Sequence, residues 1–195
     1  MTMRESKKKR TTKETDIDIY LNLDVFCEPS IATGIPFFDH MLFQLSIHGG
    51  FNLIIQAKGD LDVDYHHLVE DVGILLGQCF HEAIGDKKGI RRFGFALTPM
   101  DEALVEVAVD ISGRPYLNYD VSINNKNIMS FDADLIYEFL YAFAMNAKIT
   151  MHIIKRYGNN THHVIEAIFK SWAIALKDAF TIGGDIIKST KGLIE

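Results

Sequence analysis

The sequence predicts an α+β fold made of two similar halves. Two pentapeptides of one pattern, His-His-Leu-Val-Glu at residues 66–70 and His-His-Val-Ile-Glu at residues 162–166, lie 96 residues apart. Residues 51–54 align with residues 149–152 at an offset of 98, close to that spacing. A strand, a helix, a strand and a helix that carries the His-His-x-x-Glu pattern follow one another twice. This repetition is typical of an internal duplication in which two half-domains share one core.

Hydrophobic periodicity predicts the elements of the first half. Residues 16–24 alternate apolar and polar side chains, which is the pattern of a half-buried strand. Residues 37–48 carry apolar side chains at helical spacing, and the Gly49-Gly50 pair ends that helix. A second strand over residues 51–57 and a long helix over residues 68–84 follow.

The second half repeats this order. Residues 103–111 resemble the opening strand of the first half, and residues 134–146 are helical. A strand over residues 149–154 precedes a helix over residues 164–180, which has one apolar face. The matching order supports the duplication.

The domain organisation follows from the charge pattern and the repeat. Residues 1–13 are polar and basic and predict a flexible N-terminal arm, because a run such as Lys7-Lys8-Lys9-Arg10 is usually solvated. The remainder forms a single domain over residues 14–195. Its two repeats cover about 14–97, with a strand predicted over residues 93–97, and about 98–195.

Composition and charge exclude several function classes. The net charge is −6, and no basic face follows residue 13, which argues against a nucleic-acid partner. No apolar run approaches the roughly 20 residues that a membrane span needs, and residues 1–13 lack the apolar stretch of a signal peptide. Cys27 and Cys79 lack metal-binding spacing, so we expect a reduced, cytoplasmic setting without a disulfide.

The two pentapeptides predict metal ligands. A glutamate four residues after a histidine lies about one helical turn further along the same face, so His66 and Glu70 can converge on one ion, as can His162 and Glu166. The second histidine of each pair points about 100° away on a helix and is a poor partner for that ion. Each pentapeptide is therefore suited to two metals, or to one metal and a neighbour. The alternative is a pair of helix starts that are merely rich in polar residues.

The repeat extends this ligand set. At an offset of 98, His40 corresponds to Glu138, and both lie on the helix that precedes a ligand-bearing helix. A surface role is the alternative for both side chains. Five imidazoles and three carboxylates could hold two ions, with open positions that favour Mn or Fe over a structural Zn. The predicted ligands are His40, His66, His67, Glu70, Glu138, His162, His163 and Glu166.

Acidic residues beside these ligands are candidates for a supporting role. Metal-bound imidazoles usually donate their second N–H to a carboxylate or carbonyl, which Asp39, Asp64 or Asp71 could supply. For Asp71 the alternative is a charge placed favourably at a helix start.

Cationic residues in predicted turns and on the last helix suggest an anionic substrate group, most simply phosphate. Taken singly, each is more often a surface charge, and only the association with the metal motifs favours a binding role. These residues are Arg92, Arg114, Lys170 and the Ser189-Thr190-Lys191-Gly192 segment.

Several sequence blocks lie at a spacing that matches a known family. The blocks are Gly34-Ile35-Pro36-Phe37-Phe38-Asp39-His40-Met41-Leu42, His66-His67-Leu68-Val69-Glu70-Asp71, Pro99-Met100-Asp101-Glu102-Ala103-Leu104, Ser112-Gly113-Arg114-Pro115-Tyr116-Leu117, His162-His163-Val164-Ile165-Glu166-Ala167 and Ser189-Thr190-Lys191-Gly192. From about residue 13 to the C-terminus, the chain resembles the imidazoleglycerol-phosphate dehydratase family of histidine biosynthesis.

The resemblance carries expectations for the fold and the assembly. It implies half-domains that each pack a small, mostly antiparallel sheet against helices, as in the ribosomal protein S5 domain 2-like fold. It also implies two Mn²⁺ ions per active site and sites shared between subunits of a 24-subunit homo-oligomer. One position departs from the pattern, because many members carry histidine where this chain has Glu138.

The resemblance further implies the reaction and the residues that carry it. Imidazoleglycerol phosphate would lose water through a metal-stabilised imidazolate to give imidazoleacetol phosphate. Glu14 matches the family's acid–base candidate. A dinuclear metallohydrolase acting on a phosphorylated small molecule is the alternative, and a non-enzymatic metal-binding assembly protein is a third. By the same resemblance, the substrate contacts are Gln44, His48, Arg92, Arg114, Lys170, Ser189 and Lys191.

Overall fold

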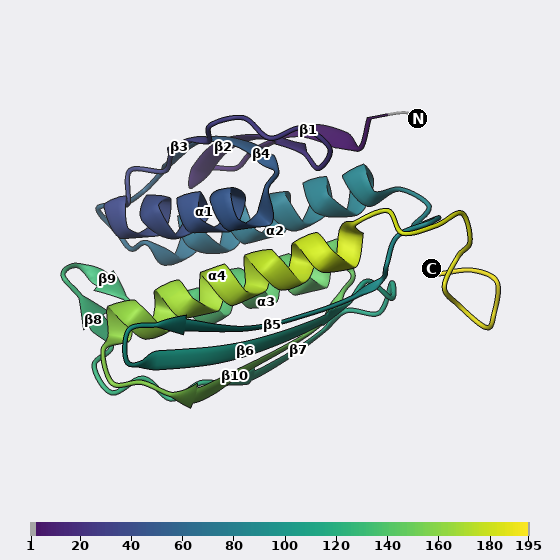
Figure 1. The fold of residues 1–195 in the computed structure, drawn as a ribbon. Helices are drawn as coiled ribbons and strands as arrows, with labels where there is room; N and C mark the ends of the chain where they lie inside the picture. The colour runs from purple at the N-terminus through teal and green to yellow at the C-terminus, as the bar shows by residue number, and fades with distance from the viewer. Residues whose placement is uncertain (1–2, 195) are drawn as a thin grey trace.

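The computed structural model describes residues 3–194 and places four helices between two four-stranded sheets (Figure 1). The first sheet has the strand order β1-β2-β4-β3 and the second β5-β6-β10-β7. The first half consists of β1 (Glu5–Thr11), β2 (Thr15–Asn22), β3 (Ser30–Ala32), α1 (Pro36–Gly49), β4 (Asn52–Gly59) and α2 (His66–Ile84).

The second half repeats the first with one added hairpin, β8–β9. In each sheet the first two strand pairs are antiparallel and the last pair is parallel. The predicted α+β fold of duplicated half-domains is therefore confirmed. The second half consists of β5 (Phe93–Met100), β6 (Ala103–Asp110), β7 (Tyr116–Asp120), β8 (Asn127–Ile128), β9 (Phe131–Asp132), α3 (Leu135–Ala147), β10 (Thr150–Tyr157) and α4 (Thr161–Phe180).

The core lies between the sheets and the helices, and it continues across the two halves. Alternate residues of β2 and β6 point inward and are buried, as the period of two in a strand requires. Helix α1 packs on α4, and α2 packs on α3. Gly73 lets α2 approach α3 closely, because a Cβ atom there would lie 2.7 Å from the carbonyl oxygen of Phe139. This cross-half packing brings side chains of one repeat next to those of the other.

The flexible arm predicted for residues 1–13 is wrong over residues 5–11, which form β1 at the edge of the first sheet. Residues 1 and 2 lie outside the described residues. A lysine-rich strand is common at a sheet edge, where the charges discourage pairing with another chain. Two of these charges are also paired with acidic side chains of α2, Lys8 with Glu82 and Arg10 with Asp71.

The predicted repeat boundary between residues 97 and 98 falls inside β5. Strand β5 occupies the same edge position in the second sheet as β1 does in the first, so each half begins with one of these strands. The division between the halves therefore lies between Ile84 and Phe93. Within residues 3–194, none of the helices combines the length and the apolar character that crossing a membrane would require.

Candidate metal centre and anion cavity

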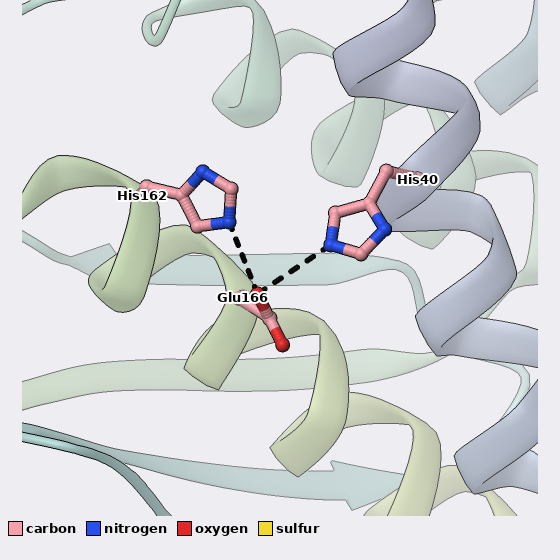
Figure 2. Close-up of side chains that lie close together, drawn as sticks. All are labelled: His40, His162 and Glu166. Atoms are coloured by element: carbon pink, nitrogen blue, oxygen red, sulfur yellow. Dashed lines mark hydrogen bonds and ion pairs between the residues drawn. The ribbon is translucent and has the colours of Figure 1, made fainter.

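Three predicted ligands converge where α1 meets α4 (Figure 2). The Nε2 atoms of His162 and His40 lie 3.1 and 3.5 Å from Oε2 of Glu166. Ligand atoms bound to one ion at about 2.1 Å lie roughly 3–4 Å from each other, so this trio fits a divalent cation. Across residues 3–194 it is the one group of three or more His, Cys, Asp or Glu ligand atoms that all lie within 4.8 Å of one another.

Helix α4 positions two of the three ligands through its first turns. The side chain of Asn160 caps the helix by accepting hydrogen bonds from the backbone N–H groups of His162 and His163. The i,i+4 spacing then places His162 and Glu166 on one face. Both motif helices begin near the β8–β9 hairpin, since Tyr65 contacts Ser130 and Thr161 donates to the carbonyl of Asn125.

Glu166 is buried and held ionised. Its side chain is 7% exposed, and Oε1 accepts a hydrogen bond from Nζ of Lys170 at 2.7 Å. Burial alone would raise the pKa of Glu166, but the hydrogen bond and charge of Lys170, with the bonds from His162 and His40, hold it below its ordinary value. A carboxylate must be deprotonated to bind a metal, so this setting favours metal binding.

The corresponding trio of the first half is less compact. His66 Nε2 lies 3.5 Å from Oε2 of Glu70, so the i,i+4 pair forms as predicted. Glu138 lies half-buried on α3, which packs against α2. Its carboxylate does not come within 4.8 Å of both partners, in contrast to His40 in the other trio. Its role as a ligand stays a prediction.

The second histidine of each motif points away from the first. Their ring planes are nearly perpendicular, at 84° for His66 and His67 and 87° for His162 and His163. Nδ1 of His67 lies 3.1 Å from Oδ2 of Asp60, and this hydrogen bond raises the pKa of the imidazole. Each motif can therefore serve two different ions, as its spacing predicts.

Two glutamates occupy equivalent places in the two halves. Glu14 and Glu102 each immediately precede the second strand of their sheet, and each faces the second histidine of a motif. Oε2 of Glu102 lies 2.6 Å from Nδ1 of His163, and this bond, with bonds from the backbone of Asn160 and Asn159, lowers the pKa of Glu102 to about 2. Oε2 of Glu14 stays 3.9 Å from Nδ1 of His67, and its side chain is 55% exposed.

The contacts of Asp60 and Glu102 with the motif histidines were not predicted. Neither residue lies on a motif helix, so helical periodicity carries no signal for them. The equivalence of Glu102 with Glu14 in the repeat could have identified it.

Two predicted substrate contacts continue the polar face of α1 beyond His40. Nε2 of Gln44 lies 3.5 Å from Nε2 of His40, and Nε2 of His48 lies 3.0 Å from Oε1 of Gln44. Burial and the positive charge of Lys170 lower the pKa of His48, which keeps it neutral near pH 7. A neutral imidazole and an amide beside the predicted metal ligands suit hydrogen bonding to a polar substrate.

A cavity of about 530 Å³ collects four of the five predicted anion-binding residues: Arg92, Arg114, Ser189 and Lys191. Arg92 is oriented by Asp110, which accepts from Nε at 2.7 Å and from Nη2 at 3.1 Å. The fifth predicted residue, Lys170, lies elsewhere and contacts Glu166.

The cavity and the metal trio lie far apart within one chain. Arg92 immediately precedes β5, and Met100 is the last residue of that strand. Sδ of Met100 lies 3.4 Å from Nζ of Lys170, which in turn contacts Glu166. Eight residues of strand span roughly 24 Å at about 3.4 Å per residue. The backbone N–H of Arg92 also bonds to Ala179 near the end of α4, opposite the end that carries Glu166. One chain alone therefore does not bring the two groups together.

The duplicated fold, the His and Glu trio and the arginine cavity together fit the class of metal-dependent enzymes that act on anionic substrates. A family model described as imidazoleglycerol-phosphate dehydratase matches residues 33–176. The chain belongs to the imidazoleglycerol-phosphate dehydratase family, whose members are metal-dependent hydro-lyases of histidine biosynthesis.

Individual relatives agree over the full length. The imidazoleglycerol-phosphate dehydratase of Caldicellulosiruptor saccharolyticus is 50% identical over 194 residues, covering 100% of both chains. That of Bacillus pumilus is 49% identical, covering 98% of this chain and 100% of its own. The crystal structure of the Staphylococcus aureus enzyme has a TM-score of 0.83 at 42% identity, covering 92% of this chain and 99% of its own. The Pyrococcus furiosus structure has a TM-score of 0.84 at 40% identity, covering 96% and 100%.

Proposed function

We propose that this chain dehydrates imidazoleglycerol phosphate with two Mn²⁺ ions, and that subunits of a homo-oligomer share each active site. The reaction itself follows from membership of the family: the chain is a hydro-lyase that removes water from imidazoleglycerol phosphate in histidine biosynthesis. The observation that carries the metal proposal is the convergence of His40, His162 and Glu166. The metallohydrolase alternative is set aside, because the family's chemistry is elimination of water and not hydrolysis.

The predicted ligands divide naturally into two sets. His40, His162 and Glu166 would hold one ion, and the repeat assigns His66, Glu70 and Glu138 to the other. His67 and His163 point away from these sets and would complete the coordination of ions in neighbouring copies. When bound, the ions would supply positive charge that favours the ionised form of the substrate's imidazole ring.

Glu14 is suited to move protons beside this site. Its carboxylate lies near His67 but remains largely exposed, so it is free to accept a proton from the substrate and to return one. Gln44 and the neutral His48 would orient the substrate by hydrogen bonds, since they continue the polar face of α1 beyond His40. The cationic cavity around Arg92 and Arg114 would bind the phosphate group.

The separation of the cavity from the trio supports a shared site. A five-membered ring, three carbons and a phosphate are much shorter than the roughly 24 Å between the two ends of β5. A second copy must therefore bring its cavity to this chain's ligands. The outer face of β5 exposes Phe93, Phe95 and Leu97, which are 58%, 56% and 49% exposed and offer apolar surface for such contacts. We infer a 24-subunit assembly from the family resemblance.

We also place the enzyme in the cytoplasm. Cys27 and Cys79 are both free thiols, which suits a reducing compartment.

The test combines activity, metal content and size. Purified protein should form imidazoleacetol phosphate, lose activity on exhaustive chelation, and regain it with Mn²⁺ better than with Mg²⁺. Mass measurement in solution should give a multiple of the 22.1 kDa chain. Full activity after chelation would refute the metal proposal, and an active monomer would refute the shared site.

A further inference from the structure

Asp71 follows the last residue of the first motif, and it is 8% exposed. Its two carboxylate oxygens point to the sheet. Oδ1 accepts a hydrogen bond from Nε of Arg10 on β1 at 2.8 Å, and Oδ2 accepts one from Oγ1 of Thr15 on β2 at 2.6 Å. These bonds join helix α2, which carries the first motif, to two strands of the sheet. The sequence suggested two other roles for Asp71, a partner for a metal-bound imidazole or a charge at a helix start, and the bonds serve neither.

The bonds continue from Thr15 to the turn that carries Glu14. Oγ1 of Thr15 lies 3.1 Å from Oγ1 of Thr12, which in turn accepts from the backbone N–H groups of Glu14 at 3.1 Å and Thr15 at 3.0 Å. Because an ionised carboxylate only accepts, the Thr15 hydroxyl must donate to Asp71, and the Thr12 hydroxyl must then donate to Thr15. The hydroxyl protons of Thr12 and Thr15 therefore both point along this series of hydrogen bonds toward Asp71, and hydrogen bonds in such a series strengthen one another.

The second half lacks this arrangement. Ala167 follows Glu166 where Asp71 follows Glu70, and Ala103 opens β6 where Thr15 opens β2. There the equivalent glutamate is held by its own carboxylate: Glu102 accepts from the backbone N–H groups of Asn159 and Asn160 and bonds to His163.

The two halves therefore hold their glutamates in different ways. In the second half the carboxylate is occupied. In the first half, Asp71 holds the backbone of the turn through Thr15 and Thr12, and the carboxylate of Glu14 makes no close hydrogen bond within the described chain and stays 3.9 Å from Nδ1 of His67.

We propose that Asp71 is a positioning residue, which fixes the Glu14 turn to the metal-bearing helix so that the free carboxylate keeps its place beside His67. The inference rests on the proposed acid–base role of Glu14. A displacement of about 1 Å at such a group can lower the rate of a reaction roughly 100-fold.

The test uses Asp71→Asn in the full chain, assembled and loaded with Mn²⁺. The amide keeps the size of the side chain but cannot accept at both former oxygens. We expect kcat to fall about 10- to 100-fold, with KM, Mn²⁺ content and assembly size unchanged. Asp16→Asn is the matched control, since it removes the same charge at an exposed position beside Thr15, and it should retain wild-type kcat.

A threonine pair keeps the test decisive if Asp71→Asn does not fold. Thr15→Val removes the hydroxyl at constant shape and should lower kcat as Asp71→Asn does, whereas Thr15→Ser keeps the hydroxyl and should restore it. In a Glu14→Gln background, Asp71→Asn or Thr15→Val should cause little further loss, because the group that they position is already inactive.

Wild-type kcat in both Asp71→Asn and Thr15→Val would overturn the inference, as would losses that multiply with Glu14→Gln or that track lost metal. If Glu14→Gln is slow while Asp71→Asn and Thr15→Val are not, the inference alone fails. Full turnover of Glu14→Gln would instead refute the acid–base role on which the inference rests.

Discussion

Both carboxylate oxygens of Asp110 accept hydrogen bonds from Arg92, which lines the cationic cavity: Oδ1 lies 2.7 Å from Nε and Oδ2 lies 3.1 Å from Nη2. Arg92 also donates from Nη1 to the carbonyl of Lys188. Its backbone has a φ of 75°, a region that costs a non-glycine residue of order 1–3 kcal/mol. These bonds fix the guanidinium in the cavity that we propose as the phosphate site.

Asp110→Asn should therefore weaken substrate binding more than turnover. The amide breaks the paired hydrogen bonds, and a misoriented guanidinium binds phosphate less well. We expect KM for imidazoleglycerol phosphate to rise about 10-fold, the equivalent of roughly 1.4 kcal/mol, with kcat changed less. Asp178→Asn is the control, because it breaks the neighbouring pair with Arg91 outside the cavity. An unchanged KM in Asp110→Asn would contradict the role of the cavity.

Glu138 is a ligand that the repeat proposes and that no close contact in the described part of the structure tests. If the repeat assigns it correctly to an ion with His66 and Glu70, then Glu138→Ala should lose about one of two Mn²⁺ ions per chain. Glu138→His restores the residue that many family members carry and should keep both ions, because imidazole and carboxylate both bind Mn²⁺. Metal analysis after dialysis gives the stoichiometry. His81→Ala, a change at the far end of α2, should leave it unaltered. Two ions retained by Glu138→Ala would exclude this ligand.

The parts of the site set by helical period were predictable from the sequence. The pairs His66 with Glu70 and His162 with Glu166 depend only on i,i+4 spacing, and both form. His40 was predicted as a ligand, but which of the two His-His-x-x-Glu motifs it would join was not predictable. That choice depends on the packing of α1 against α4 across the two halves, and local periodicity carries no information about such a long-range contact.

The parts missed from the sequence have physical reasons as well. Strand β1 has the pattern of a solvated basic run because it is an edge strand and Ser6 is its one fully buried residue. The half-buried residues on the same face, Lys8 and Arg10, are charged and pair with acidic side chains of α2. The partners of the second histidines, Asp60 and Glu102, come from turns whose positions only the folded sheets fix.

The pair of Arg4 and Asp24 predicts a pH dependence of stability. Nη2 and Nε of Arg4 bond to Oδ1 of Asp24 at 2.6 and 2.9 Å, and Nη1 donates to the carbonyl of Phe180 at the end of α4. Burial would raise the pKa of Asp24, but the bonds from Arg4 outweigh it and hold the pKa below its value of 3.8. A depressed folded-state pKa contributes stability above pH 3.8, and this is lost as the pH falls through the lower value.

Asp24→Asn should therefore lower the melting temperature at pH 7 and have a smaller effect near pH 3. The side chain of Asp24 is 34% exposed, so solvent screening limits the contribution to about 1 kcal/mol or less. That corresponds to a shift of roughly 2–4 °C for a chain of this size. Thermal unfolding of both proteins at the two pH values gives the comparison, with the exposed Asp62→Asn as control. An equal shift at both pH values would show that charge is not the cause.

Cys79 should resist alkylation in the folded protein. Its thiol is buried on α2, and desolvation is the main cause that raises its pKa to about 11, so almost no thiolate forms at pH 8. Cys27 lies exposed and serves as the internal comparison. We expect iodoacetamide at pH 8 to leave Cys79 unmodified, as read by peptide mass, until denaturant unfolds the chain, when both thiols react. Modification of Cys79 in folded protein at the rate of the unfolded chain would mean that α2 opens readily, which is incompatible with a helix that holds three proposed metal ligands in fixed positions.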